Sequence, residues 1–315
     1  MNDIKKRIPK SVELDNGIKL LLAINGVLLI ALVSLYFMLP LNHNNKKTPA
    51  SKPPITKTLS ADGDSIQNMI QATLGEESPK FAVYFFRPNI DEEPFIFQSR
   101  PMQPASMIKV FIMAKIMQEV KDGNIALDEI ITITPENIVG GAGSIAGEGA
   151  GARVPLRRAL ELMIMESDNT ATNILIDRVG MANLNQYLND NDYHDTVINH
   201  KMMKEQGKSN LSSAADLGKF FTRLYNNQCV DNYYDRVMID YLLKQQDRDC
   251  FPAALPYWNV AHKTGEISNV YDDGGIFYGA KGDFILVIMN ENIDGHGDAI
   301  DKMKKIAAQL ADNFT

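Results

Sequence analysis

A serine and a lysine stand one helical turn apart at Ser106 and Lys109, in a segment, Met107–Val120, that is apolar on every face. A serine hydroxyl is a weak nucleophile and needs an adjacent base. Residues three apart on a helix share a face, so the two side chains are neighbours. Burial among apolar side chains disfavours the charged form of lysine and lowers its pKa. The pair therefore predicts a serine nucleophile with a lysine base.

The place of Ser106 at the start of the predicted helix adds a second function. Backbone N–H groups and the dipole at a helix N-terminus stabilise a developing oxyanion. The spacing alone also fits a capping serine followed by a lysine whose amine reaches water. Apolar surroundings make an idle Lys109 costly, and they favour the catalytic interpretation.

A second string, Ser167-Asp168-Asn169, lies between predicted helices at about 155–165 and about 171–179. Its residue types are preferred helix N-caps, so one role is to begin the second helix. A loop between two packed helices also projects side chains into a cleft. The two roles are compatible.

A third string, Lys263-Thr264-Gly265, ends a predicted edge strand whose first residues are Asn259–His262. Glycine in a strand allows another backbone or a ligand to approach closely. A cation and a hydroxyl side by side can hold a carboxylate. An exposed lysine at a strand end is the alternative for such a string when it occurs alone.

The three strings in this order resemble the class A β-lactamase and penicillin-binding family, and the resemblance extends from about Ala61 to the end of the chain. It implies an active-site serine hydrolase that is acylated by β-lactams or by D-Ala-D-Ala-like peptides. It implies that Ser106 is the nucleophile, that Lys109 is its base, and that no cofactor takes part.

The resemblance also implies roles for the other motif residues. Ser167 would relay a proton to the leaving nitrogen, and Asn169 would bind the substrate amide. Lys263, Thr264 and Gly265 would contact a substrate carboxylate, and the backbone N–H of Glu266 would complete the oxyanion hole.

Two departures from the family pattern concern release of the acyl group. Class A β-lactamases have an E-x-x-L-N segment whose glutamate activates the deacylating water, and no such segment follows Ser167 here. Glu205 has similar spacing in a different context, and Glu166 directly precedes Ser167, so neither takes that role by resemblance. The last arginine is Arg248, so none follows the Lys263 string to bind a carboxylate. The residues present support acylation better than deacylation.

Three functions therefore stay open on the sequence. They are β-lactam hydrolysis, a D,D-peptidase or other peptidoglycan-modifying activity, and a sensor that is acylated once or not at all. In each case the expected partner is a β-lactam or a D-Ala-D-Ala-like peptide, and we expect a monomer.

Other functions fit the composition poorly. Residues 61–315 carry 23 basic and 36 acidic side chains, an acidic balance that argues against nucleic-acid binding. The five histidines show no spacing typical of metal ligands. The glycine-rich loop 140–151 lacks the Gly-Lys-Ser/Thr ending of a phosphate-binding loop. The chain also has no G-x-S-x-G elbow.

The order of predicted elements indicates an α/β (α+β) fold, with a mixed, mainly antiparallel sheet flanked by helices and an all-helical lobe. The predicted strands are 81–86, 94–97, 259–262, 275–278 and 283–290. The predicted helices are 65–74, 107–120, 155–165, 171–179, 214–225, 231–245 and a closing amphipathic helix with Asp298 as its N-cap. A cleft between lobe and sheet is the expected place for a small molecule.

The start of the chain indicates a membrane anchor. Leu20–Leu39 is an apolar run that, at ~1.5 Å per residue, can cross a hydrocarbon core of ~30 Å. Basic residues before it favour a cytoplasmic N-terminus. We expect residues 1–17 in the cytoplasm, 18–40 as a transmembrane signal anchor, 41–60 as a disordered linker, and 61–315 as the catalytic domain on the extracytoplasmic side of a bacterial cell membrane.

The two cysteines, Cys229 and Cys250, bracket the predicted helix at 231–245. Cysteines of an exported protein can form a disulfide. Pairing here requires a loop that brings the chain back along the length of that helix. The sequence leaves both states open.

Overall fold

The computed structural model describes residues 59–204 and 207–315. The chain divides into two units, residues 1–57 and residues 58–315, and the elements described below belong to the second. The predicted cytoplasmic segment, the signal anchor and the linker up to residue 58 lie outside the described residues. Within the described ranges, no helix has the length and apolar character needed to cross a membrane.

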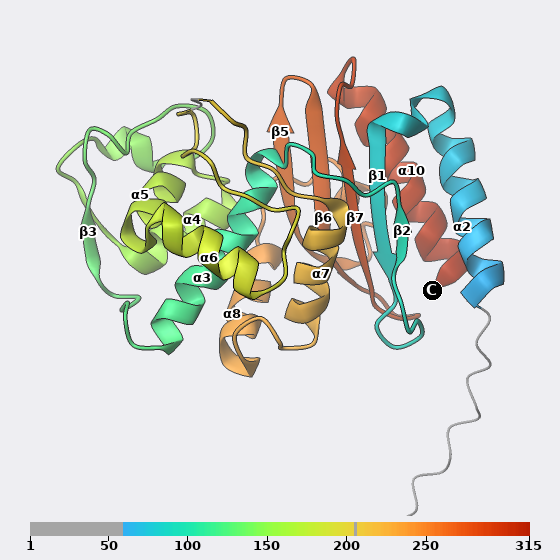
Figure 1. Ribbon diagram of the computed structural model, residues 1–315, viewed down its shortest axis with the longest axis horizontal. Coiled ribbons are helices and arrows are strands. Elements are labelled where there is room, and N and C mark those ends of the chain that lie inside the picture. Colours follow the sequence, from blue (N-terminus) through green and yellow to red (C-terminus); the bar gives the residue numbers. More distant parts are fainter. Residues whose placement is uncertain (1–58, 205–206) are drawn as a thin grey trace, which may run out of the picture. The chain divides into compact units, whose positions relative to one another are not determined.

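Five antiparallel strands form the main sheet, in the order β2-β1-β7-β6-β5 (Figure 1). They are β1 (Phe81–Phe86), β2 (Phe95–Phe97), β5 (Asn259–Ile267), β6 (Val270–Tyr278) and β7 (Phe284–Asn290). The last three strands pair in sequence order, which leaves β5 at one edge. A second, two-stranded sheet pairs β3 (Ile130–Thr132) with β4 (Arg153–Pro155).

Both faces of the main sheet are covered. Successive residues of β1, such as Phe81 and Ala82, enter different apolar clusters on opposite faces. Helices α2 (Leu59–Leu74) and α10 (His296–Phe314) pack on the face of Phe81, and the helical lobe lies on the other side (Figure 1). This double coverage explains why β1 and β7 have continuous apolar sequences instead of alternating ones.

The helical lobe is built around α3 (Lys109–Lys121), which continues directly from the short 3-10 helix η2 (Ala105–Ile108). Its other helices are α4 (Leu156–Met165), α5 (Asn169–Val179), α6 (Met181–Asp190), α7 (Ala214–Tyr225) and α8 (Asn232–Leu243). The short helix η3 (Ile145–Glu148) also belongs to the lobe, whereas η1 (Gly75–Lys80) and α9 (Phe251–Ala254) lie outside it. As predicted for a segment that is apolar all round, α3 is buried over most of its length.

The predicted fold class is confirmed, and several predicted elements have the observed bounds. Strand β1 and helix α7 begin and end at the predicted residues, and α4, α5 and α8 agree within a few residues. Sequence periodicity did not predict α6, β3 or β4.

Four predicted boundaries are wrong. Helix α2 begins at Leu59 and not at 65, and strand β6 begins at Val270 and not at 275. Strand β5 continues to Ile267, because its pairing with β6 extends to the turn, so the third motif lies inside the strand and not at its end. Helix α10 begins at His296 with Gly295 as its N-cap. Asp298 lies in the first helical turn, where its carboxylate pairs with the amine of Lys302 one turn further on.

The two cysteines are free and buried. Cys229 belongs to the apolar cluster of the helical lobe, whereas Cys250 belongs to the cluster on the other face of the sheet. The open question of a disulfide is thereby answered, since the two thiols are in separate cores.

Candidate active site

Ser106 lies in η2, just before α3 begins at Lys109. The turn starts at Ala105, whose φ of 42° lies in the left-handed region that non-glycine residues rarely occupy. Such strain persists where the surrounding structure enforces it, and it is concentrated at functional sites. The fold thus presents a half-buried Ser106 at the N-terminal end of the buried helix.

Gly265 in β5 allows η2 to lie directly on the edge of the sheet. A Cβ atom at Gly265 would stand 2.5 Å from the carbonyl oxygen of Pro104 and 3.2 Å from the backbone nitrogen of Met107. Any side chain here would push η2 away from the strand. Because Ser106 lies between Pro104 and Met107, its distance from β5 depends on this glycine.

The second motif is fixed by the N-cap of α5 and by the glycine-rich loop. The Asp168 carboxylate accepts hydrogen bonds from the backbone N–H of Ala171 at 2.7 Å and from that of Ile145, in the loop, at 2.8 Å. At Gly143, where φ is 103°, a Cβ atom would lie 2.2 Å from the Asp168 side chain. The loop therefore supports the motif, which is a role that its sequence did not reveal. Ser167 precedes the cap with a φ of 55°.

The amine of Lys109 is fully buried and contacts the second motif. It donates hydrogen bonds to the carbonyl oxygen of Ser167 at 2.6 Å, to Ser167 Oγ at 3.1 Å and to Asn169 Oδ1 at 2.8 Å. Lys109 therefore joins the helix that follows the predicted nucleophile to the residues predicted to relay a proton and to bind the substrate.

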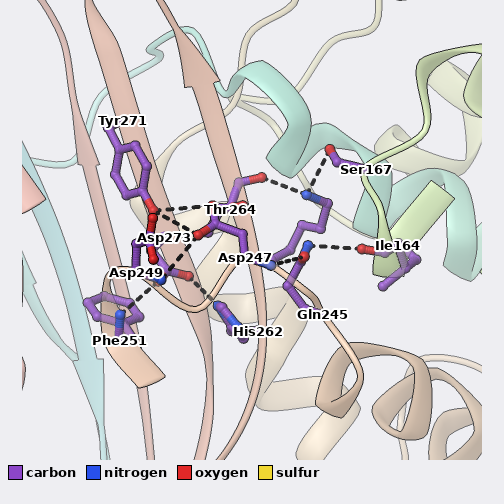
Figure 2. A network of polar contacts seen from close by, with 11 residues as sticks. Ile164, Ser167, Gln245, Asp247, Asp249, Phe251, His262, Thr264, Tyr271 and Asp273 are labelled. Carbon is purple, nitrogen blue, oxygen red and sulfur yellow. Dashed lines mark hydrogen bonds and ion pairs between the residues drawn. The ribbon is translucent and has the colours of Figure 1, made fainter. Parts of the chain in front are cut away.

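The amine of Lys263, also fully buried, approaches Ser167 from the sheet. It donates to Ser167 Oγ at 3.0 Å and to the carbonyl oxygen of Thr264 at 2.8 Å. Figure 2 shows Ser167 and Thr264 in this network. The hydroxyl of Ser167 thus lies between two lysine amines that come from different lobes, which is suitable for passing a proton.

Burial lowers the pKa of both lysines, though to different extents. For Lys109, loss of water is the largest cause, the nearby charge of Lys263 adds to it, and the pKa falls well below its usual value of 10.5. For Lys263, burial also dominates, but the carboxylates of Asp247 and Asp273 act in the opposite direction, and the pKa is about 8. Lys109 is therefore the lysine that is more readily neutral, and so free to accept a proton, near neutral pH.

Sequence reasoning missed these acidic neighbours of Lys263. Asp273 stands opposite Thr264 in the β5–β6 register, and its carboxylate pairs with Nδ1 of His262 at 2.9 Å. Asp247, in the segment after α8, accepts a hydrogen bond from the hydroxyl of Tyr271 at 3.2 Å. Figure 2 shows both carboxylates in the network beside Thr264. No local sequence pattern joins them to the third motif.

Two cavities of about 910 Å³ and about 100 Å³ share Ser106, Asn169 and Glu266 in their walls. The larger is also lined by Ser167 and Thr264, and its volume suits a small molecule or a short peptide. The structure therefore brings all eight predicted site residues to one place. They are Ser106, Ser167, Asn169, Thr264 and Glu266 in the cavity walls, Lys109 and Lys263 buried against Ser167, and Gly265 beneath η2.

Comparison with known proteins agrees with this geometry. Residues 64–314, most of the chain, match the Beta-lactamase enzyme family. The chain belongs to this β-lactamase family. Among curated proteins, it is similar to Beta-lactamase VEB-1 of Pseudomonas aeruginosa, with 23% identity over 247 residues that cover 72% of this chain and 82% of that protein.

Solved structures of the β-lactamase fold superpose on this family member over about four fifths of its length. PBP-A has 26% identity and a TM-score of 0.73, and the match covers 79% of this chain and 96% of PBP-A. A β-lactamase of Sphaerobacter thermophilus has 23% identity and a TM-score of 0.72, with coverage of 80% and 98%. A PBP-A point mutant with 26% identity, a TM-score of 0.72 and coverage of 80% and 96% is an acyl-enzyme complex with penicillin G.

This β-lactamase-family hydrolase lacks the E-x-x-L-N glutamate of class A β-lactamases, and other carboxylates stand near Ser106. Within the described ranges, the carboxylates that line the two cavities belong to Glu166, Asp247 and Glu266. The region that follows the second motif brings Met203 into both cavity walls, and Glu205 lies outside the described residues.

Proposed function

We propose that this β-lactamase-family enzyme is acylated at Ser106 by β-lactams and releases the acyl group slowly. The observation that carries the proposal is the position of the two buried lysines. Lys109 and Lys263 both bind the hydroxyl of Ser167, at the wall of the cavity that Ser106 shares. In this arrangement Lys109 would be the base, Ser167 the proton relay, and Lys263 the cation.

Acylation proceeds by a balanced proton transfer. The neutral amine of Lys109 accepts the proton of Ser106 Oγ, and the oxygen attacks the carbonyl carbon of the β-lactam ring. The N–H groups of Ser106 and Glu266 receive the negative charge of the carbonyl oxygen. When the ring C–N bond breaks, the Ser167 hydroxyl gives its proton to the departing nitrogen and takes one from a lysine amine. All atoms of the β-lactam stay on the enzyme.

Slow deacylation follows from the carboxylates available to activate water. Glu166 and Asp247 lie in the wall of the larger cavity, on the side of Ser167 and Thr264, where the departing nitrogen is placed. On the other side, the smaller cavity is lined by Met202, Met203 and His200, and its one carboxylate within the described ranges, Glu266, pairs with His296. The acyl-enzyme complex of a PBP-A mutant with penicillin G supports acylation by this class of compound.

A D,D-peptidase is the second candidate, because the larger cavity also has room for a short peptide. The same residues would attack the amide of a D-Ala-D-Ala-like peptide and protonate its departing amine. A sensor that keeps its acyl group is the limiting case of slow release. These functions share the first step and differ in the second.

We also propose that the enzyme acts as a monomer outside the cytoplasmic membrane, anchored by residues 18–40. The apolar run and the basic residues before it support this location. Fusion of a periplasmic reporter enzyme after residue 60 tests it: we expect reporter activity, and its absence from an expressed fusion would contradict the orientation.

Labelling with a fluorescent penicillin tests the acylation step. Folded wild-type protein should carry one label, and Ser106→Ala should carry none, because the nucleophilic oxygen is removed. Thermal unfolding of both proteins checks that the variant is folded. An unlabelled wild type of normal stability would contradict the proposal.

A chromogenic cephalosporin, followed over many equivalents of substrate, tests the release step. We expect a burst of one equivalent followed by slow turnover, because acylation is supported by more groups than deacylation. Rapid steady turnover without a burst would identify an efficient β-lactamase and contradict slow release. Glu205→Gln tests the nearby glutamate, since an unchanged release rate would eliminate it as the water-activating base.

A further inference from the structure

The cleft around Ser106 has two chemically different halves. The smaller cavity is lined by amide, hydroxyl and thioether groups together with one histidine: Gln103, Ser209, Asn210, Met202, Met203 and His200. The larger cavity extends past Ser167 and Thr264, which act on the leaving-group side of the substrate, to Glu166 and Asp247. The two halves meet at Ser106, Asn169 and Glu266.

The leaving-group half is acidic. Its walls contain the carboxylates of Glu166, Asp247 and Glu266, and within the described ranges they contain no lysine or arginine side chain. Among the described residues, Glu266 pairs with Nδ1 of His296 at 3.0 Å, whereas neither Glu166 nor Asp247 has an ion-pair partner. These two carboxylates are thus left without an ion pair on this side, and Asp247 acts on Lys263 only through its charge.

In the part of the chain that the structure describes, the nearby cations form no ion pair with the carboxylates of Glu166 and Asp247. Lys263 is buried behind the wall, where it donates to Ser167 Oγ and to the carbonyl of Thr264. Arg158 lies near Glu166 but forms its ion pair with Glu148. Lys263 and Thr264 can thus hold a substrate carboxylate, whereas any further charged group on this side would meet the two carboxylates.

We propose that Glu166 and Asp247 determine specificity on the leaving-group side, selecting substrates whose leaving group carries a positive charge. This inference rests on the proposed acylation at Ser106. A cation placed beside the two carboxylates, beyond the substrate carboxylate that Lys263 and Thr264 hold, gains attraction from both, in a cavity that is only partly open to water. Among the described residues, the amide-lined half on the acyl side contains no carboxylate besides the shared Glu266, which is paired with His296, and it accepts neutral, peptide-like groups.

Two cephalosporins that differ only at C3 test this proposal. One carries a neutral acetoxymethyl group, and the other carries a cationic pyridinium-methyl group on the leaving-group side of the ring. The second-order rate constant of acylation is measured for both compounds by stopped-flow at low and at high salt. We expect wild type to prefer the cationic compound by about tenfold at low salt, and by less at high salt, because salt screens partly exposed charges.

The variants Glu166→Gln and Asp247→Asn should each reduce the preference by about threefold and together abolish it. The change should appear in the apparent dissociation constant and not in the limiting acylation rate, which separates charge selection from a disturbed site. Asparagine keeps an oxygen that can accept the hydrogen bond from Tyr271. Asp301→Asn is the matched control, because Asp301 is 77% exposed on α10 and pairs with Lys304.

The outcomes distinguish this inference from the function on which it rests. Acylation by both compounds with equal rate constants, or a preference that survives in the double variant, would overturn the charge selection alone. Failure of both compounds to acylate folded wild type would overturn the proposed function and the inference with it. A preference lost in the double variant and kept in Asp301→Asn supports the proposal.

Discussion

Lys109 and Lys263 are both fully buried and both bind the hydroxyl of Ser167, yet their surroundings differ. Lys109 comes from the helical lobe, where burial and the charge of Lys263 lower its pKa far below the usual value. Lys263 comes from the edge strand, where the carboxylates of Asp247 and Asp273 offset part of the burial and its pKa stays at about 8. One lysine is thus suited to accept a proton and the other to keep its charge at neutral pH.

Replacing each lysine gives the largest expected effects. Lys109→Met should slow acylation by about 10³- to 10⁴-fold, because the base is lost. Lys263→Met should slow it by about 10- to 100-fold, mainly through weaker substrate binding, because a charge-assisted contact is lost. Stopped-flow acylation with a chromogenic cephalosporin measures both rates.

Lys115→Met is a control on the same helix, since the Lys115 amine pairs with Glu119 away from the site. It should leave the acylation rate unchanged. If Lys263→Met were the more damaging change, the assignment of the base to Lys109 would be wrong.

The pH dependence of acylation separates the two lysines further. The rate should rise as pH increases through the depressed pKa of Lys109, because only its neutral amine accepts a proton. It should fall as pH increases through about 8, where Lys263 loses its charge. In Asp273→Asn the loss of a carboxylate should lower the pKa of Lys263 and move this alkaline limb to lower pH.

The acid limb should stay in place in Asp273→Asn, and Asp301→Asn should move neither limb. An alkaline limb that does not move in Asp273→Asn would show that this limb does not report Lys263.

Two glycines keep the site in place, and replacing them should have smaller effects. Gly265 lets η2 lie against β5, and Gly143 leaves room for Asp168 in the second motif. Gly265→Ala places a Cβ atom 2.5 Å from the Pro104 carbonyl oxygen, and the displaced η2 should slow acylation by about 10- to 100-fold. Gly143→Ala should lower the free energy of unfolding by about 1–3 kcal/mol, because φ is 103° and the added atom collides with Asp168. Acylation rates and thermal unfolding measure the two effects.

Gly147→Ala is the matched control for both changes, because a Cβ atom there meets no atom within 4 Å. It should keep the wild-type rate and stability. A normal acylation rate in Gly265→Ala would show that close contact between η2 and β5 is not needed to place Ser106.

The positions of the candidate site residues could be predicted because they lie in short local patterns. The spacing of Ser106 and Lys109, and the apolar character of α3, are enough to predict a buried lysine next to the serine. The preference of aspartate for N-caps similarly predicts the start of α5 at the second motif. These properties depend on neighbours within one or two turns.

The surroundings of Lys263 depend on contacts that no local pattern contains. Asp247 reaches the site from the segment after α8, and Asp273 from the neighbouring strand β6. The support that Gly143 gives to Asp168 is likewise a contact between separate segments. Sequence alone therefore predicted the lysines but not which of them keeps its charge.

The most direct test of the account is intact-protein mass spectrometry after incubation with penicillin G. Ring opening on Ser106 loses no atoms, so wild type should gain the mass of one whole penicillin, on the peptide that contains Ser106. The adduct should persist after free penicillin is removed, and folded Ser106→Ala should show none. An adduct on another residue, or an unmodified wild type of normal stability, would contradict acylation at Ser106.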